Sequence, residues 1–397
     1  MGQLISRRSL VGGAAGLVAA IAAGGYAPMT ALTAGSAAPP SPLFVYVGCY
    51  TSKERRGRGE GISVYRMDPL SGNWTDVQLV KGLVNSSFLA LDREKRFLYS
   101  VHGDGEQATA FAIDKATGHL TLLNQQSTGG KNGVSLAVDA TNRFLVVGNY
   151  SSGTVAVLPI VGDGTGNGTL APLSHLVALS GEPGPHRDEQ ASSHPHDVRF
   201  DRGGRFVVVP DKGLDKVFVY RLDTASGKLV ANDPPAVKTR PGAGPRHVDF
   251  HPSQPYAYVI NELDSTITTY SFDMERGDLK PLQVISTLPP DFTGNNTTSE
   301  IAVAPSGRFV YGSNRGHHSI AIFSVNPTSG VLSPVGWESS RGLTPRFFAL
   351  DPTGTFLYAA NLDSDTIVTF RVDQATGKLL ATGQVIKTGS PSTIVFR

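Results

Sequence analysis

The feature that most constrains the fold of this chain is a repeat with a period of about fifty residues. A short apolar segment with an aromatic residue near its start, here named the anchor, recurs seven times. The intervals between successive anchor aromatics are 53, 47, 62, 50, 53 and 47 residues, for Phe44, Phe97, Phe144, Phe206, Tyr256, Phe309 and Phe356. Repeats of this length build arrays in which each unit buries its apolar face against its neighbours. Seven structural units are therefore expected between residue 44 and the C-terminus.

Each unit has the pattern of four antiparallel strands. An alternating segment such as residues 266–270 follows the anchor, then a turn of the form Asp-x-x-x-Gly-x-Leu, as in residues 114–120, and then a more polar strand. Period-2 alternation with frequent turn signals indicates antiparallel sheet, and no segment shows a convincing helical period. Four strands per unit and seven units predict an all-β fold, a seven-bladed β-propeller.

The two ends of the chain predict how the ring closes. The first unit begins directly with its anchor at Phe44, whereas an extra strand, residues 392–396, follows the last unit. We expect this C-terminal strand to become the innermost strand of the first blade. Closure of this kind removes the exposed edge that an open array would present.

The first 38 residues are expected to be an export signal, and the propeller domain is placed at residues 39–397. The leader has no acidic residue, and Arg7 and Arg8 precede a mildly apolar, glycine-rich stretch and a tail of small residues. It resembles a twin-arginine signal, which implies the twin-arginine translocase as a partner and a periplasmic or extracellular location. Glycines interrupt the stretch, which falls short of the ~20 strongly apolar residues of a membrane span, so a stable anchor is not expected.

Composition excludes several functional classes. The 35 Lys and Arg against 33 Asp and Glu give a formal charge of +2, too little to attract nucleic acid by bulk charge. Removal of Arg7 and Arg8 leaves 33 basic against 33 acidic residues, a formal charge of zero. The single cysteine, Cys49, excludes an internal disulfide framework and any site built from several thiolates.

The predicted strand order gathers polar residues at one mouth of the central channel. In a four-stranded blade, the loop that leads into the innermost strand and the loop that leaves the second strand lie on the same face. A concave site is therefore expected at that face. The polar residues at these places include His194, His196, Arg246, His247, Asn261, Glu262, Glu300, Asn314, Arg315 and Arg346.

Three strings on these loops carry a resemblance to a known family. They are Pro-Gly-Ala-Gly-Pro-Arg-His at 241–247, Asn-Glu-Leu-Asp-Ser-Thr at 261–266 and Ser-Asn-Arg-Gly-His at 313–317. Together they resemble the lactonase family of seven-bladed propellers, which includes the propeller-type 6-phosphogluconolactonase and the fungal carboxy-muconate lactonising cyclase. The resemblance covers the chain from about residue 43 to its end. The chain departs from the family where a Pro-His-x-His string is usual, because residues 193–196 are Ser-His-Pro-His.

The resemblance implies a set of site residues. The implied active site is His196, Arg246, Glu262 and Arg315, with His194, His247, Asn261 and Asn314 as neighbours; placement at the mouth adds Glu300 and Arg346 as substrate-binding candidates. Opening a lactone needs a base that activates water, a donor for the oxyanion and a group that anchors the substrate. We expect Glu262 to be the base and His196 to deliver a proton to the leaving hydroxyl. Arg246 and Arg315 suit the binding of a carboxylate, a phosphate or the oxyanion.

Other roles for these residues remain open on the sequence alone. Arg246 and Glu262 also fit a structural ion pair. His247 is expected to point away from Arg246, because consecutive strand residues face opposite sides. No metal or other cofactor is expected: His194 and His196, with His317 or His318, could bind a metal, but no carboxylate cluster with ligand spacing accompanies them.

Three functions compete for this site. The first is hydrolysis of a sugar-type lactone, similar to that of 6-phosphogluconolactonase, with a small anionic or sugar lactone as substrate. The second is the reaction of a carboxy-muconate cycloisomerase, and the third is a non-catalytic propeller that binds a ligand or a protein. Export argues for an unphosphorylated substrate. The insertion at residues 159–193, which causes the longest interval between anchors, is either a lid or a surface loop.

Overall fold

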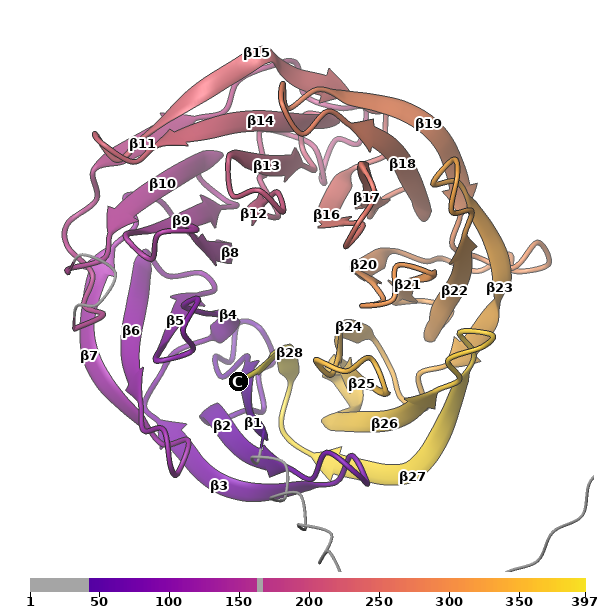
Figure 1. Cartoon of the computed structure of the whole chain (residues 1–397), viewed down its shortest axis with the longest axis horizontal. Coiled ribbons are helices and arrows are strands. Elements are labelled where there is room, and N and C mark those ends of the chain that lie inside the picture. Colours follow the sequence, from indigo (N-terminus) through magenta and orange to yellow (C-terminus); the bar gives the residue numbers. More distant parts are fainter. Residues whose placement is uncertain (1–42, 163–166) are drawn as a thin grey trace, which may run out of the picture. The chain divides into compact units, whose positions relative to one another are not determined.

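Seven four-stranded blades surround a central channel in the computed structural model, which describes residues 43–162 and 167–397 (Figure 1). All blades are antiparallel sheets, so the predicted seven-bladed β-propeller is confirmed. Within the described ranges, the single helical element is a 3-10 turn, η1 (Leu362–Ser364), and no helix there is long and apolar enough to cross a membrane. The predicted export signal lies outside the described residues.

The strands of each blade follow one another from the channel outward. Blade 1 contains β28 (Pro391–Phe396), β1 (Leu43–Cys49), β2 (Gly61–Met67) and β3 (Trp74–Lys81); blade 2 contains β4 (Ser86–Leu91), β5 (Phe97–His102), β6 (Gln107–Ile113) and β7 (Leu120–Ser127); blade 3 contains β8 (Gly133–Val138), β9 (Phe144–Asn149), β10 (Thr154–Pro159) and β11 (His175–Ala178). Blade 4 contains β12 (Arg199–Phe200), β13 (Phe206–Asp211), β14 (Lys216–Asp223) and β15 (Lys228–Lys238); blade 5 contains β16 (Pro245–Phe250), β17 (Tyr256–Asn261), β18 (Thr266–Phe272) and β19 (Leu279–Ser286). Blade 6 contains β20 (Thr298–Val303), β21 (Phe309–Asn314), β22 (Ser319–Val325) and β23 (Leu332–Ser339); blade 7 contains β24 (Pro345–Leu350), β25 (Phe356–Asn361), β26 (Thr366–Val372) and β27 (Leu379–Lys387).

The C-terminal strand closes the ring as expected. β28 pairs with β1 in an antiparallel register in which Tyr46 lies opposite Val395 and Val47 opposite Ile394. The last residue adds one more bond, because Arg397 N donates to Phe44 O at 2.8 Å. Blade 1 is therefore built from both ends of the described chain.

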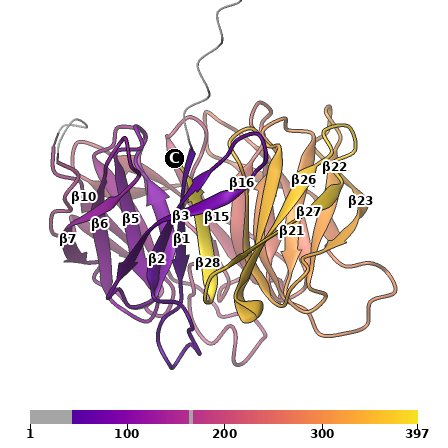
Figure 2. The ribbon, with the colours of Figure 1, turned by 90° about the horizontal axis from the view of Figure 1, so that it is seen from below.

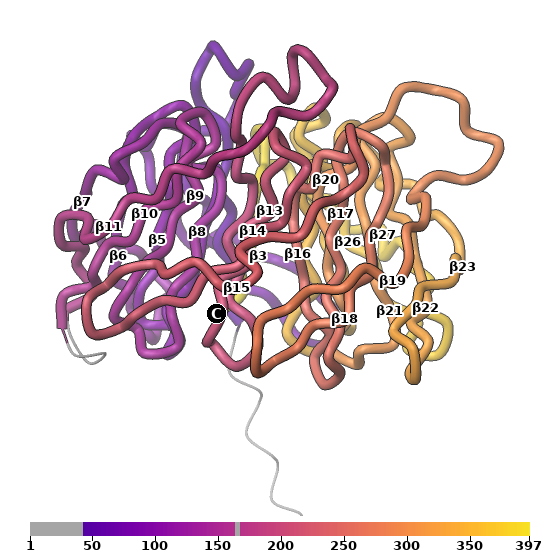
Figure 3. Tube along the Cα trace, turned by 90° about the horizontal axis from the view of Figure 1, so that it is seen from above, coloured from indigo at the N-terminus to yellow at the C-terminus, as the bar shows by residue number. Residues whose placement is uncertain are grey.

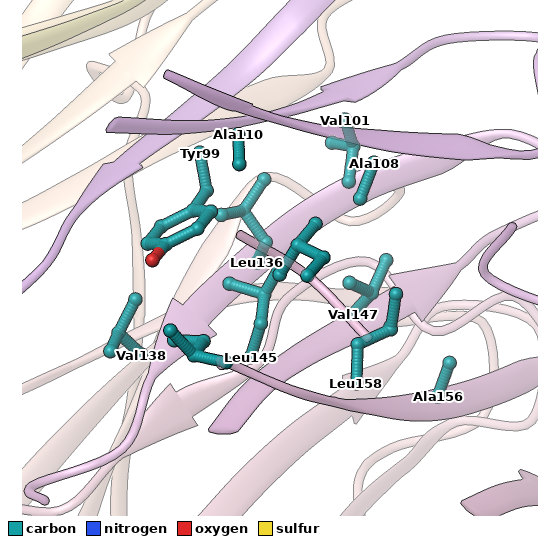
Figure 4. Packing of buried hydrophobic residues seen from close by; sticks show 12 residues of the cluster. Tyr99, Val101, Ala108, Ala110, Leu136, Val138, Leu145, Val147, Ala156 and Leu158 are labelled. Atoms are coloured by element: carbon teal, nitrogen blue, oxygen red, sulfur yellow. The ribbon is translucent and has the colours of Figure 1, made fainter. Parts of the chain in front are cut away.

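The apolar core is divided among the gaps between blades. Seven clusters of buried side chains each join two adjacent blades, including blades 7 and 1. Figure 4 shows the cluster between blades 2 and 3, where Tyr99 of β5 lies over Leu136 of β8 and Leu145 of β9. The second strand of each blade is covered on both faces, which explains why the anchors are almost continuously apolar.

Each anchor aromatic packs against a glycine in the outer turn of the next blade. Phe44 lies against Gly118, where a Cβ atom would come within 2.3 Å of the ring, and the Tyr46 hydroxyl donates to Gly118 O at 3.0 Å. Gly118 has a φ of +74°, which favours glycine. The same contact joins Phe97 to Gly168, Phe144 to Gly227, Phe206 to Gly277, Tyr256 to Gly330, Phe309 to Gly377 and Phe356 to Gly72. The repeated aromatic and glycine positions in the sequence thus correspond to a contact that recurs between every pair of adjacent blades.

Three long connections rise from one face of the propeller. They span residues 50–60, 179–193 and 288–297, and Figures 2 and 3 show them on the same side of the ring. The first leaves the second strand of blade 1, and the other two lead into the innermost strands of blades 4 and 6. This is the face on which a site was expected, and it is named the mouth below.

Candidate active site

A local irregularity at the start of the innermost strands brings side chains together in the channel. In blade 5, Pro245 pairs with Asn261 and His247 pairs with Ile260, so Arg246 is an extra residue between two ladder positions. Such a β-bulge redirects the side chains next to it. Equivalent positions in six blades line a hollow of about 10 Å³, and they are Ser87, Val134, His196, Arg246, Arg346 and Ser392. Each of six blades therefore contributes its equivalent residue to the wall of this small hollow.

The bulge also corrects the expected orientation of His247. Strict alternation would place the side chains of Arg246 and His247 on opposite sides, but Arg246 NH1 lies 3.0 Å from His247 Nε2. Both side chains line the small hollow. The expectation was wrong because the extra residue interrupts the two-residue period of the strand.

A larger hollow of about 170 Å³ lies at the mouth. Its walls include the residue that directly follows the second strand in five blades, together with residues of the neighbouring loops and of the bulges. The five residues after the second strands are Tyr50, Tyr150, Lys212, Glu262 and Arg315. The other lining residues are Arg55, Asn132, Val134, His196 and Arg346. The mouth hollow and the small hollow share four residues, so they adjoin one another.

The Glu262 carboxylate binds three cations. Its Oε2 accepts from Arg246 Nε at 2.8 Å and lies 3.1 Å from Arg315 NH2, while Oε1 accepts from Lys212 Nζ at 2.9 Å. The side chains of Arg246 and Lys212 are buried, and Arg315 is half-buried. One negative charge thus holds three positive charges at the wall of the mouth hollow.

These cations determine the ionisation of Glu262. Burial opposes its ionisation, but the charges of Arg315, Lys212 and Arg246 outweigh burial and hold the pKa of Glu262 well below its ordinary value. Burial, with the nearby charges of Arg315 and Arg346, lowers the pKa of Arg246 to about 10. Glu262 is therefore anionic and Arg246 cationic at neutral pH.

His196 is a neutral imidazole beside this cluster. Burial and the charge of Arg246 hold its pKa well below 6.5. Its Nε2 lies 3.9 Å from Glu262 Oε2, too far for a hydrogen bond, and its buried Nδ1 has no partner among the described residues. The Tyr150 ring meets it edge-on, with centroids 5.3 Å apart. A buried imidazole with unused ring nitrogens on a hollow is a group that can accept and return a proton.

Three arginines retain donors that no described residue uses, and one of these donors is the buried Nε of Arg315. Arg246 donates through Nε to Glu262 and through NH1 to Ser299 O at 2.8 Å, which leaves its NH2 group without a described partner. The Arg346 guanidinium has no hydrogen bond or ion pair among the described residues and lies 5.3 Å from the centroid of the Tyr50 ring. Arg346 lines both hollows and Arg246 the smaller one. These donors can bind an oxyanion or a substrate oxygen.

Glu300 lies behind His247 rather than on either hollow. Its Oε2 is 3.1 Å from His247 Nδ1. Since Arg246 NH1 donates to His247 Nε2, the ring proton of the neutral imidazole is on Nδ1 and points at Glu300. Burial raises the pKa of Glu300 to about 7. Glu300, predicted to bind substrate, is therefore placed to orient His247 instead.

The structure also separates three other predicted residues from the hollows. Asn261 donates through Nδ2 to Thr266 Oγ1 within blade 5. Asn314 of blade 6 donates through Nδ2 to Thr287 O, in the connection from blade 5 to blade 6, at 2.8 Å. His194 stacks on the Tyr150 ring at a centroid distance of 4.4 Å. None of the three lines either hollow.

Lys212 and Tyr50 were missed by the sequence analysis. Both occupy the position directly after a second strand, as do Glu262 and Arg315, which were identified. A comparison of this position in all seven repeats would have found them. Asparagine at the preceding position recurs in four blades, at Asn149, Asn261, Asn314 and Asn361. That recurrence was a sign of a structural role.

A second hollow, of about 680 Å³, lies beside the outer strands of blades 1 and 7 and lacks this chemistry. It contains none of the cluster residues, and the ion pair at its rim, Arg58 with Asp365, is exposed. Among residues 43–162 and 167–397, no group of three or more His, Cys, Asp or Glu side chains is arranged to hold a metal ion.

Comparison with known proteins bears on the activity. The sequence matches the family described as "Lactonase, 7-bladed beta-propeller" over residues 44–396. It is 37% identical over 305 residues to a 6-phosphogluconolactonase of Bacillus subtilis strain 168, covering 76% of this chain and 83% of that protein. A second relative, named 6-phosphogluconolactonase in Formosa agariphila, is 33% identical over 316 residues, which cover 77% of this chain and 86% of that protein.

Solved structures of proteins described as lactonases are similar to this chain over a larger part of its length. The periplasmic gluconolactonase of Pseudomonas aeruginosa superposes with a TM-score of 0.82 at 33% identity, covering 90% of this chain and 99% of that one. A putative 6-phosphogluconolactonase of Bacteroides fragilis gives a TM-score of 0.83 at 31% identity, covering 91% and 99%. The similarity includes the blades that carry the mouth hollow.

Proposed function

The chain belongs to the lactonase family of seven-bladed β-propellers, and we propose that it opens the ring of a sugar-type lactone at the mouth of its channel. It is a lactone-hydrolysing enzyme of the 6-phosphogluconolactonase type, that is, a carboxylic ester hydrolase. The observation that carries the proposal is the joint presence of a neutral histidine and several cationic donors on adjoining hollows.

Hydrolysis requires one proton to move from water to the ring oxygen of the lactone. We assign this transfer to His196, which accepts the proton as the water oxygen attacks the carbonyl carbon. The bond between that carbon and the ring oxygen then breaks, and His196 returns the proton to the leaving oxygen, which becomes a hydroxyl group. The free donors of Arg246 and Arg346 stabilise the negative charge on the carbonyl oxygen.

Glu262 is a weaker candidate for the base than the sequence suggested. Both carboxylate oxygens already face cations, and these cations hold its pKa well below the ordinary value. A water molecule would have to compete with these cations for the Glu262 oxygens, whereas Nδ1 of His196 has no partner among the described residues. The contacts of Glu262 support a different role, in which it fixes the positions of Arg246, Arg315 and Lys212.

We also propose that the protein is exported through the twin-arginine translocase. The support is the arginine pair at residues 7 and 8 and the similarity to a solved periplasmic gluconolactonase. Replacing both arginines with lysine is expected to leave the enzyme in the cytoplasmic fraction. Equal periplasmic amounts of the variant and the wild type would refute this route.

The activity is tested with a panel of sugar and muconate lactones assayed by proton release. We expect wild-type protein to hydrolyse sugar lactones, and His196→Gln and Arg246→Ala to lower kcat by roughly 100-fold. His119→Gln, at an exposed histidine, is the matched control and should keep full activity. Glu262→Gln is avoided as the primary test because it leaves three cations without their counter-charge.

The outcomes separate the alternatives. No hydrolysis above the spontaneous rate with any lactone would favour a binding propeller. Turnover of muconate lactones alone would favour the cycloisomerase reaction. Full activity in His196→Gln would refute its assigned role while leaving the activity itself intact.

A further inference from the structure

The predicted insertion, residues 159–193, includes β11 of blade 3, and only its second half belongs to the connection from blade 3 to blade 4. This half, residues 179–193, places an acidic residue at the site. It rises from the mouth (Figure 3) and is anchored on blade 4. The buried Gln190 donates through Nε2 to Lys212 O and to Asp215 Oδ1, both at 2.8 Å. Glu189, its neighbour, is thereby held next to the Lys212 side chain.

The three ammonium protons of Lys212 face three protein acceptors. Its Nζ lies 2.9 Å from Glu262 Oε1, 2.5 Å from Glu189 Oε2 and 3.2 Å from the Tyr150 hydroxyl. An ammonium group has three donors and no more. Lys212 lines the mouth hollow but has no donor left for a ligand.

Lys212 differs in this respect from the arginines of the site. Arg246 and Arg346 keep donors that no described residue uses, so they can bind a substrate without losing a protein contact. A ligand that used Lys212 would first have to displace Glu189. Half of the Glu189 side chain is exposed, so the ion pair has an outer side in water.

We propose that Glu189 is a specificity-determining residue that occupies the anion-binding position of Lys212 and thereby favours uncharged sugar lactones over phosphorylated ones. This inference rests on the proposed lactonase function. A phosphate group requires charged donors, and here the ammonium is saturated and a carboxylate lies beside it. A hydroxyl group at the same place carries no charge, so the Glu189 carboxylate does not repel it.

The experiment compares Glu189→Gln with Asp188→Asn. Asp188 is the exposed neighbour in the same loop, so both variants remove one negative charge from the same segment. The substrates are δ-gluconolactone and its 6-phosphate, which differ only in the phosphate group, and the measured quantity is the ratio of their kcat/KM values. We expect Glu189→Gln to raise kcat/KM for the phosphorylated lactone roughly tenfold relative to the other, through KM, because the repelling charge is gone and a phosphate displaces a neutral amide from Lys212 more easily than a carboxylate. Asp188→Asn should keep the wild-type ratio, and equal ratios in both variants would overturn the inference.

A second measurement does not depend on hydrolysis. Calorimetric titration with inorganic phosphate should give a Kd for Glu189→Gln roughly tenfold lower than for Asp188→Asn. Equal phosphate affinities would overturn the role of Glu189 even in an active lactonase. If neither lactone is hydrolysed by the wild type, the proposed function fails, while this titration still decides whether Glu189 blocks Lys212. Because Gln190 anchors the loop, both variants are expected to unfold at the wild-type temperature.

Discussion

At the scale of single residues, the positive charges at the mouth are compensated mainly by the carboxylate of Glu262. Glu262 holds Arg246, Arg315 and Lys212 together, and Glu189 adds a second negative charge on the outer side of Lys212. Removing one partner of a buried ion pair costs ~3–5 kcal/mol, because the other charge stays buried without compensation. Glu262 thus contributes both to the stability of the fold and to the positions of the arginine and lysine donors. Variants of the exposed Glu189 change the charge at the site without leaving these cations uncompensated.

Glu300 gives the protein a stability that depends on pH. Burial raises its folded pKa to about 7, above its ordinary value of 4.5. Between these two pH values the folded state keeps a proton that the unfolded state has lost, so stability falls as pH rises from about 4.5 to about 7, by a total of about 3 kcal/mol. Glu300→Gln cannot ionise but still offers His247 an acceptor, and we expect it to be more stable than the wild type at pH 8 and equal to it at pH 4. Urea unfolding at both pH values measures this, with Glu182→Gln as the exposed control.

At the scale of elements, the outer turn of each blade is matched to the anchor of the blade before it. The glycine of this turn has a positive φ and accepts the anchor's aromatic ring where a side chain would stand. Two separate requirements therefore select glycine at the same position. A substitution there disturbs the turn and the contact between blades together.

Gly118→Ala separates these requirements when it is compared with Gly383→Ala. Both glycines have positive φ, but a Cβ at Gly118 would lie 2.3 Å from the Phe44 ring, whereas nothing lies within 4 Å of one at Gly383. We expect Gly383→Ala to cost ~1–2 kcal/mol for backbone strain alone, and Gly118→Ala ~1–3 kcal/mol more for the displaced ring. Chemical unfolding measures both, and an equal loss in the two variants would show that the ring contact contributes nothing.

The same scale explains how much could be predicted from the sequence. The blades and the closure were predictable, because the anchor aromatic and the turn glycine recur about every fifty residues. Of the ten residues that line the mouth hollow, four were predicted: His196, Glu262, Arg315 and Arg346. The orientation of His247 was not, because the extra residue Arg246 reverses which face the next side chain takes, and local sequence did not signal the bulge. The contact between Glu189 and Lys212 joins residues from an insertion and a strand end, and no repeat marks such a pair.

At the scale of the whole molecule, one strand from the C-terminus completes the first blade. Deleting residues 391–397 should expose β1 as an edge in the channel and lead to aggregation or a large fall in the melting temperature. β28 ends opposite the start of β1, where Phe396 pairs with Val45. The deleted strand can therefore be placed before β1 in the sequence and still pair with it in the same register. Residues 391–397 joined by a short turn ahead of Leu43 should restore the melting temperature. A truncated protein that melts like the wild type would contradict the closure.

Ring closure also has a consequence for when the enzyme becomes active. The small hollow takes its walls from six blades, including Ser392 of β28 and Tyr50 after β1. We expect a nascent or partly refolded chain whose β28 has not yet docked to lack one wall of this hollow. The recovery of lactonase activity during refolding should therefore coincide with the docking of β28. It should lag behind the formation of sheet in the individual blades. The pairing of β28 with β1 is thus the folding step at which we expect activity to appear.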